Sequence, residues 1–259
     1  PAAEGGSVIL NKAVIPHETL LNQAKEQYEA AEKAAKSDAL KSFKGFDQNA
    51  AIRQIKTYEL KLAMHRGQYA DAKTFVEGAL KDGETVEVIY NNDGGDNPLY
   101  SAIGPNSRDV QVSPSLEAAR TTDAEKKALP LAHASVDKKN PNRYNIYASG
   151  LTRKGSIIIS NDDDIHLIKA ELIVRGIMTG DAMTEVNKVI GKYDTASQLS
   201  TAPTLAQIAE LRRIFLAFRG ERTADIRRGL EQGSAATTWA SRKIKWLPMP
   251  EKELQSQGL

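Results

Sequence analysis

The four histidines are the first residues to test for chemistry, because imidazole serves acid–base catalysis and metal binding. They are His17, His65, His133 and His166, and no two stand at the i, i+4 spacing of helical zinc ligands. The absence of cysteine excludes disulfides, thiolate metal sites and a cysteine nucleophile. The sequence also lacks a G-x-S-x-G nucleophile motif, a G-x-G-x-x-G dinucleotide motif and a phosphate-binding P-loop motif. We therefore predict that the protein is not an enzyme.

Two runs of oxygen-bearing side chains have the composition of Ca²⁺ ligands. The first is NNDGGDN at residues 91–97, which lacks the closing glutamate of a helix-loop-helix site, so a plain turn is the alternative. The second is Asp162, Asp163 and Asp164, which precede an apolar series and are also typical of a helix start. We favour the turn and the helix start. No cofactor is predicted, and Ca²⁺ stays the alternative.

Six arginines gather in one short segment and raise the question of an anion or nucleic-acid site. They are Arg212, Arg213, Arg219, Arg222, Arg227 and Arg228. Because Glu210, Glu221 and Asp225 are interleaved with them, we predict structural ion pairs. In these pairs Arg222, and Arg227 or Arg228, contact carboxylates of the helical layer that include Asp225. The whole chain has 35 Lys+Arg against 33 Asp+Glu, a net charge of +2. This balance predicts no nucleic-acid partner.

The segment between residues 91 and 155 is rich in Asn, Asp, Gly, Pro and Ser and is too long for a simple connection. Polar loops that carry tyrosines are typical of adaptable binding surfaces. The alternative is that these tyrosines only anchor the loops to the rest of the protein. A tryptophan near the C-terminus also has a flat face suited to a sugar ring, although packing is its alternative role. The predicted ligand-binding residues are Asn91, Asn92, Asp93, Tyr100, Tyr144, Tyr147 and Trp239.

Helices are predicted on both sides of this segment. Apolar residues recur at helical spacing in three segments: residues 18–36, a segment that begins at a cap on Asp47 or Asn49 and ends near Gly67, and residues 68–81. Because short turns join them, we predict that these helices form antiparallel hairpins. Four further helices are expected. The first begins at Asp162, the second follows the turn at residues 178–181, the third begins at the capping box of Thr204 and Gln207, and the fourth covers residues 221–230. In between, TVEVIY at residues 85–90 predicts a strand, and residues 114–120 and 123–129 predict short helices.

The two helical blocks are similar to each other. Residues 58–72 align with residues 168–182, and each predicts a helix, a glycine turn and then an Asp-Ala pair that opens the partner helix. This is the arrangement of tetratricopeptide units, although the match to their consensus is poor. Because two units are too few for a free-standing solenoid, we expect them to pack on the irregular half of the chain.

Five segments along the chain form a recognisable series: RGQYADA at residues 66–72, Pro114-Ser115, IKAEL at residues 168–172, LRRIFLAFRGERTADIRR at residues 211–228 and WLPMPEKEL at residues 246–254. Together they resemble the SusD/RagB family of nutrient-binding outer-membrane lipoproteins. Their order and spacing agree with the family over residues 18–254. Thr223 and Ala224 depart from it, because they stand where the family usually has aromatic residues.

The resemblance implies a mainly α fold in which tetratricopeptide-like hairpins pack with a long loop-rich region. It implies a single domain over residues 1–259, with hairpins at 18–81, a loop-rich region with short strands at 82–161, a helical block at 162–230 and a tail at 231–259. Family members are longer and begin with a lipid-bearing cysteine that this sequence does not contain. We therefore expect either the C-terminal portion of such a protein or a reduced, divergent member.

In function, the resemblance implies non-catalytic capture of an oligosaccharide or peptide at the cell-surface face of the outer membrane. Its implied partner is a TonB-dependent, SusC-like transporter that receives the nutrient. The alternative is a structural or assembly protein that uses the helical scaffold for protein–protein contacts, including self-assembly. The aromatic content of 6% and the long irregular middle favour that alternative.

Overall fold

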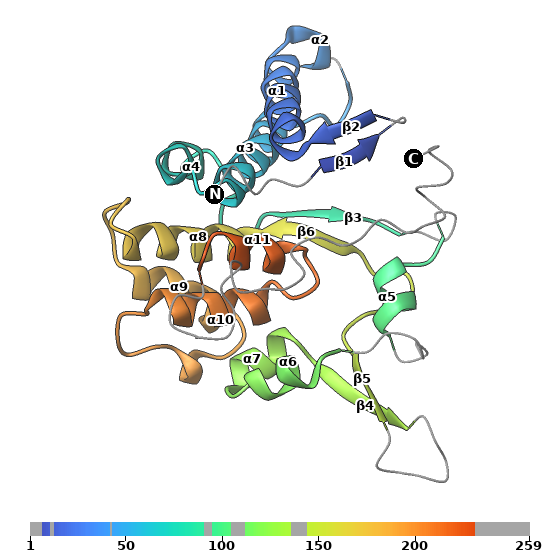
Figure 1. The fold of residues 1–259 in the computed structure, drawn as a ribbon, viewed down its shortest axis with the longest axis vertical. Helices are drawn as coiled ribbons and strands as arrows, with labels where there is room; N and C mark the ends of the chain where they lie inside the picture. Colours follow the sequence, from blue (N-terminus) through green and yellow to red (C-terminus); the bar gives the residue numbers. More distant parts are fainter. Residues whose placement is uncertain are drawn as a thin grey trace. The chain divides into compact units, whose positions relative to one another are not determined.

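The structure is a computed structural model, and it describes residues 7–10, 13–41, 43–90, 95–104, 112–135 and 144–230 (Figure 1). The chain divides into two compact units. Among the described residues, the first unit runs to Ala79 and the second begins at Leu80. The single domain expected over residues 1–259 stays a prediction. In the described part of the chain, no helix combines the length and the apolar character needed to cross a bilayer.

The first unit is built from helices and one β-hairpin. Its elements are β1 (Ser7–Leu10), β2 (Ala13–Pro16), α1 (His17–Ala35), α2 (Asp38–Lys41), α3 (Gln48–His65) and α4 (Tyr69–Val76). The predicted cap at Asp47 is confirmed, since its side chain accepts a hydrogen bond from the Ala50 amide at 3.0 Å. The helix predicted over residues 68–81 is α4, and it ends at Val76 because the backbone beyond it forms tighter, three-residue turns. The Gly78 and Ala79 amides bond back only three residues, to Phe75 and Val76.

Helix α3 is the centre of the first unit, with α1 on one side and α4 on the other. The rings of Tyr28 and Tyr58 stack at a centroid distance of 5.8 Å and join α1 to α3. The Lys56 ammonium contacts Glu32 at 2.6 Å and Glu59 at 2.7 Å, and it lies 5.2 Å from the centre of the Phe75 ring. One lysine therefore links all three helices.

The second unit combines two small antiparallel sheets with a helical layer. Its strands are β3 (Thr85–Val88), β4 (Leu131–Ser135), β5 (Tyr144–Ala148) and β6 (Ile157–Asn161). Its helices are α5 (Pro98–Ile103), α6 (Pro114–Ala119), α7 (Asp123–Ala128), α8 (Asp162–Val174), α9 (Ala182–Gly191), η2 (Thr195–Ser197), α10 (Leu205–Phe215) and α11 (Glu221–Arg227). Strand β3 pairs with β6, and β4 pairs with β5. The strand predicted over residues 85–90 is present over Thr85–Val88. The two predicted short helices are confirmed, and the mainly helical fold class is confirmed with them.

The core of the second unit lies where α7, α8, α9 and α10 meet. Its fully buried side chains include Leu167 on α8, Val186 and Val189 on α9, and Ile208 on α10. The predicted capping box opens α10, since the Thr204 amide donates to Gln207 Oε1 at 2.8 Å and the Gln207 amide donates to Thr204 Oγ1 at 3.2 Å. Local caps and apolar periodicity thus determine the helical layer.

The two hairpins α3–α4 and α8–α9 share a glycine turn after the leading helix, but they differ in how the second helix begins. Gly67 and Gly176 follow the two leading helices with φ of 68° and 72°, a left-handed conformation that favours glycine. Asp181 caps α9 by accepting from the Met183 amide, whereas Asp71 lies inside the first turn of α4. The expected equivalence of the two Asp-Ala pairs is therefore wrong, because α4 begins much sooner after its glycine than α9 does.

The three acids at the start of α8 form a buried, charge-compensated group. The Lys192 ammonium contacts Asp162 at 2.6 Å and Asp163 at 2.7 Å. Asp164 accepts from the Asn161 amide at 3.1 Å, as in a capping box, and contacts the Arg219 guanidinium at 2.9 Å. The helix start favoured from the sequence is present, and two cations not anticipated there hold the acids.

The unfolding free energy is expected to fall as the pH drops below about 4, the ordinary range of carboxyl groups. Burial raises the pKa of Asp162, but the Gly83 amide and Lys192 outweigh it and hold the pKa below its usual value. A carboxyl of lowered pKa contributes stability above its unfolded pKa, and that contribution is lost as pH falls through the folded pKa. Urea midpoints measured against pH, for the wild type and Asp162→Asn, check this. A variant that loses as much stability on acidification as the wild type would contradict it.

Candidate functional site

Helix α5, which carries Tyr100, is fixed by the buried side chain of Asn97. The side-chain oxygen Oδ1 of Asn97 accepts hydrogen bonds from the Leu99 amide at 2.8 Å and the Tyr100 amide at 3.2 Å. The side-chain nitrogen Nδ2 of Asn97 donates to the Gly155 carbonyl at 2.8 Å. The Asn97 backbone amide donates to the Arg153 carbonyl at 2.9 Å. One residue therefore caps the helix and attaches it to the turn that precedes β6.

Sequence reasoning missed Asn97, although a signal was present. Asn followed by Pro98 is the pattern of an N-cap with proline at the first helical position. The neighbouring Asp96 strengthens the same attachment by contacting Arg153 at 2.7 Å and Lys154 at 3.2 Å. Because these ion pairs are exposed, they help to fix the position of the segment but add little to the free energy of unfolding.

Strand β5 contacts α5 and carries the second tyrosine, Tyr147. Along this strand Ile146 and Ala148 are buried, and Tyr147 between them is half-buried, as alternation along a strand requires. Tyr100 is also half-buried. The structure thus brings Tyr100 and Tyr147 onto two contacting elements.

The other predicted ligand residues are placed as follows. Tyr144 is the first residue of β5, in register with Ser135 of β4. Asn91, Asn92, Asp93 and Trp239 lie outside the described residues. The ligand-binding role of all seven residues stays a prediction.

Asn97→Ala is expected to loosen α5 without unfolding the second unit. The variant loses a cap worth about 1 kcal/mol and one further hydrogen bond of similar size. Amide hydrogen exchange of residues 99–103 should therefore accelerate about tenfold or more, while exchange in α8 stays unchanged. Asn97→Asp is the comparison variant, because it retains the cap oxygen but replaces the donor to Gly155 by a buried negative charge, so it tests the attachment to Gly155 separately from the cap. Unchanged exchange in both variants would contradict the anchoring role.

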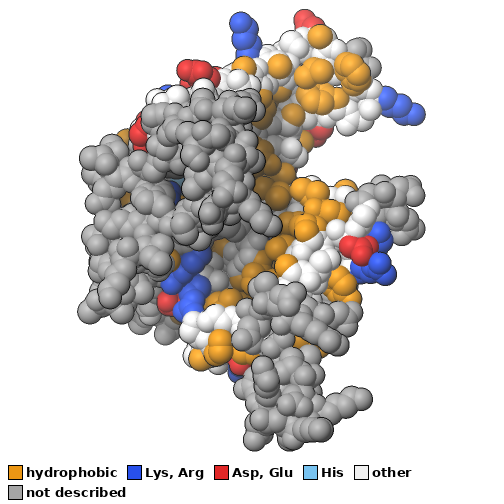
Figure 2. Space-filling view, turned by 45° about the vertical axis from the view of Figure 1, so that its right-hand side comes forward, with side chains coloured by type: hydrophobic (Ala, Val, Ile, Leu, Met, Phe, Trp, Pro, Cys, Tyr) orange, Lys and Arg blue, Asp and Glu red, His pale blue; other side chains and the backbone are white. Residues whose placement is uncertain are grey.

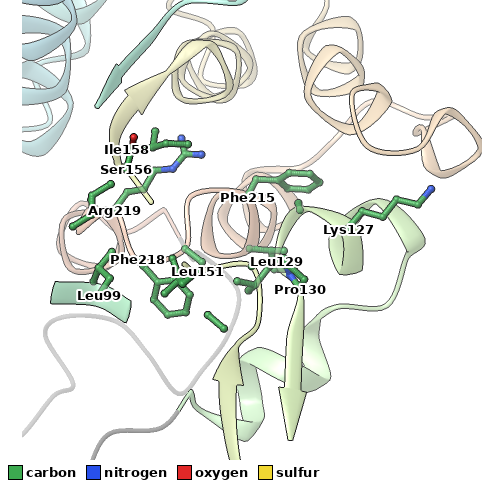
Figure 3. A pocket seen from close by; sticks show the side chains of 16 residues that line it. Leu99, Lys127, Leu129, Pro130, Leu151, Ser156, Ile158, Phe215, Phe218 and Arg219 are labelled. Carbon is green, nitrogen blue, oxygen red and sulfur yellow. The ribbon is translucent and has the colours of Figure 1, made fainter. Parts of the chain in front are cut away.

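A cavity of about 380 Å³ in the second unit is lined in part by α5 and β5 (Figure 3). It is assembled from α5, the end of α7, the end of β5 and the turn after it, the start of β6, and the end of α10. Most of its lining is apolar. Its larger apolar side chains include Leu99, Leu129, Leu151, Phe215 and Phe218.

Phe218, in the wall of this cavity, has an unusual backbone conformation. Its φ of 67° is the one positive value among the non-glycine residues that the structure describes. Bulky residues rarely adopt this left-handed conformation, and such strain is concentrated at functional sites. Gly220 follows with φ of 81°, so the chain turns sharply between α10 and α11. The turn places Phe218 on the cavity and Arg219 against the acids of α8.

The arginine-rich segment forms a buried ion cluster, comprising Arg212, Arg228, Glu171, Glu221 and Asp225. Asp225 accepts from Arg212 at 2.9 Å and from Arg228 at 2.6 Å. Arg212 also contacts Glu221 at 3.4 Å, and Arg228 contacts Glu171. Burial raises the pKa of Asp225, but the two guanidiniums outweigh it and hold the pKa below its usual value. The structure brings Asp225 and Arg228 together, while Arg222 and Arg227 lie half-buried on α11.

His166 is buried between two acids. Its ring contacts Glu185 at 2.6 Å and Asp82 at 3.1 Å, so it links α8 to α9 and to the turn before β3. Across the described residues, no group of three or more His, Asp or Glu side chains is arranged to hold a metal ion. His166 therefore serves as a structural link between α8, α9 and the turn before β3.

Comparison with solved structures finds this fold in surface glycan-binding protein A from Bacteroides thetaiotaomicron. One structure of that protein aligns with a TM-score of 0.64 and 17% identity, over 94% of this chain and 69% of that chain. A second, in complex with laminarihexaose, aligns with a TM-score of 0.62 and 17% identity, over 94% and 70% of the two chains. A scan against protein-family models and a search of curated proteins gave no match. The chain therefore has a SusD-like helical fold.

Proposed function

We propose that this protein captures an oligosaccharide or peptide nutrient at the cell-surface face of the outer membrane, without chemical change. It delivers the nutrient to a TonB-dependent, SusC-like transporter. The observation that carries this proposal is the fold shared with surface glycan-binding protein A over 94% of the chain, since one structure of that protein contains laminarihexaose. The resemblance of several short segments, such as residues 211–228, to SusD/RagB nutrient-binding lipoproteins points to the same function.

The geometry around α5 and β5 supports this function. Tyrosine offers a flat apolar face to a ligand and a hydroxyl for hydrogen bonding. Tyr100 and Tyr147 stand on elements that contact each other, and Asn97 locks α5 in place before any ligand arrives. Such preorganisation reduces the entropy cost of binding.

The second candidate is a structural or assembly protein, and one surface favours it. Val88 and Ile158, which lie on the paired strands β3 and β6, are 44% and 36% exposed, and Ile89 is 70% exposed. Hydrophobic side chains reach the surface over this ribbon (Figure 2). Exposed apolar patches often mark protein–protein contacts.

The experiment combines ligand screening with partner identification. The full chain is titrated against oligosaccharide and peptide panels, products are assayed, and co-purifying proteins from the source cells are identified by mass spectrometry. We expect reversible binding without turnover and co-purification of a TonB-dependent transporter. Ordered self-assembly without binding of any oligosaccharide or peptide would support the second candidate instead.

A further inference from the structure

We propose that the 380 Å³ cavity is a subsite for a bulky apolar side chain of a peptide ligand. This inference rests on the proposed function and deepens it, because it selects peptides carrying such a side chain over plain oligosaccharides.

The size and lining suit an aromatic or branched aliphatic group. Leu99, Leu129, Leu151, Phe215 and Phe218 supply apolar walls from separate segments of the chain (Figure 3). A cavity of about 150 Å³ with similar walls is enough to bind benzene. The present cavity of about 380 Å³ therefore has room for a phenylalanine or leucine side chain.

The charged groups of the lining are already engaged by other residues. The Arg219 guanidinium donates to Asn161 at 2.5 Å and to Asp164 at 2.9 Å. The Lys127 ammonium contacts Asp194 at 3.2 Å. A sugar ring would bring several hydroxyls that need new partners, and each one buried without a partner is costly. A phenyl or isobutyl group needs none, so the walls favour a peptide.

Exposed apolar residues adjoin the cavity. Ile158 lines the cavity and is 36% exposed, and neighbouring Ile157 is paired with the exposed Val88 of β3. An apolar side chain therefore reaches the cavity over an apolar path. Phe218 adds an independent observation, because its strained φ of 67° is kept at the wall of this cavity, and such strain is typical of ligand sites.

Calorimetric titration of the full chain tests the proposal with three probes. They are the blocked tripeptide acetyl-Gly-Phe-Gly-amide, its counterpart acetyl-Gly-Ser-Gly-amide, and laminarihexaose. We expect the phenylalanine peptide to bind at least about tenfold more tightly than the serine peptide. Ala217→Phe, which fills the cavity from its wall, should abolish this preference. Ala118→Phe, on the exposed surface of α6, is the matched control and should retain it.

A second variant covers the case in which Ala217→Phe does not fold. Leu151→Asn places an amide in the cavity and should reduce the preference for phenylalanine. Equal affinity for the two peptides, or a preference that survives both variants, overturns the subsite. Binding of laminarihexaose alone also overturns it and leaves the proposed function intact. Absence of binding by every oligosaccharide and peptide overturns both.

Discussion

Asp225→Ala is expected to lower the free energy of unfolding by about 3–5 kcal/mol, the cost of removing one partner from a buried ion pair. The Asp225 carboxylate is 2% exposed and accepts hydrogen bonds from both Arg212 and Arg228. Its loss leaves the two guanidiniums of the buried ion cluster with Glu171 and Glu221 as their remaining acids. Urea denaturation at neutral pH measures the effect.

A surface pair provides the matched control for this variant. Glu210 contacts Arg213 at 3.0 Å from the exposed side of the same helical layer, and its side chain is 50% exposed. Glu210→Ala should cost less than about 1 kcal/mol. Because the pKa of Asp225 is lowered, the gap between wild type and Asp225→Ala should narrow as the pH falls below the carboxyl range. Equal effects of the two variants at neutral pH would contradict a buried, charge-compensated cluster.

Arg219→Ala is expected to destabilise the second unit by about 3 kcal/mol. Its side chain is 9% exposed and faces Asp164 at 2.9 Å, with Asp163 at 4.0 Å. Removing this cation leaves Lys192 to balance the acids at the start of α8, so repulsion among buried carboxylates increases. Thermal and urea unfolding provide the measurement.

Two further variants separate charge from shape at this position. Arg219→Lys retains a cation but loses the guanidinium Nη1 that donates to both Asn161 and Asp164, so we expect an intermediate loss of stability. Arg213→Ala removes a guanidinium whose pair with Glu210 is exposed, and it should change stability by less than about 1 kcal/mol. A loss below that value for Arg219→Ala would show that the acids are stable without it.

The helices with strong local signals were predictable from the sequence. The cap at Asp47 and the capping box of Thr204 and Gln207 are encoded within four residues, and the apolar periodicity follows directly after them. The β1–β2 hairpin, α5 and the β4–β5 pair were not individually predicted. These elements are four to six residues long, too short for periodicity to show. For α5, contacts distant in sequence supply the support, as with Asn97 and Gly155.

The candidate site was predictable only in its composition. The tyrosine-rich middle segment drew attention to Tyr100 and Tyr147, and the structure places both on contacting elements. The cavity could not be foreseen, because its walls come from segments more than a hundred residues apart, such as Leu99 and Phe215. Likewise, interleaved acids predicted ion pairs near Arg228, but its partner Glu171 belongs to another helix. The positive φ of Phe218 runs against the preference of phenylalanine and has no sequence signal.

The most direct test of the account is a calorimetric titration of the full chain with the tightest ligand from the screen. The wild type is compared with Tyr100→Ala, Tyr147→Ala and the double variant, each verified as folded by its unfolding midpoint. The account predicts reversible binding without turnover, weakened at least about tenfold in the double variant, because buried aromatic contacts commonly dominate binding energy. If both tyrosine variants bind every detected ligand and partner as the wild type does, the surface of α5 and β5 is structural and the proposed site is wrong.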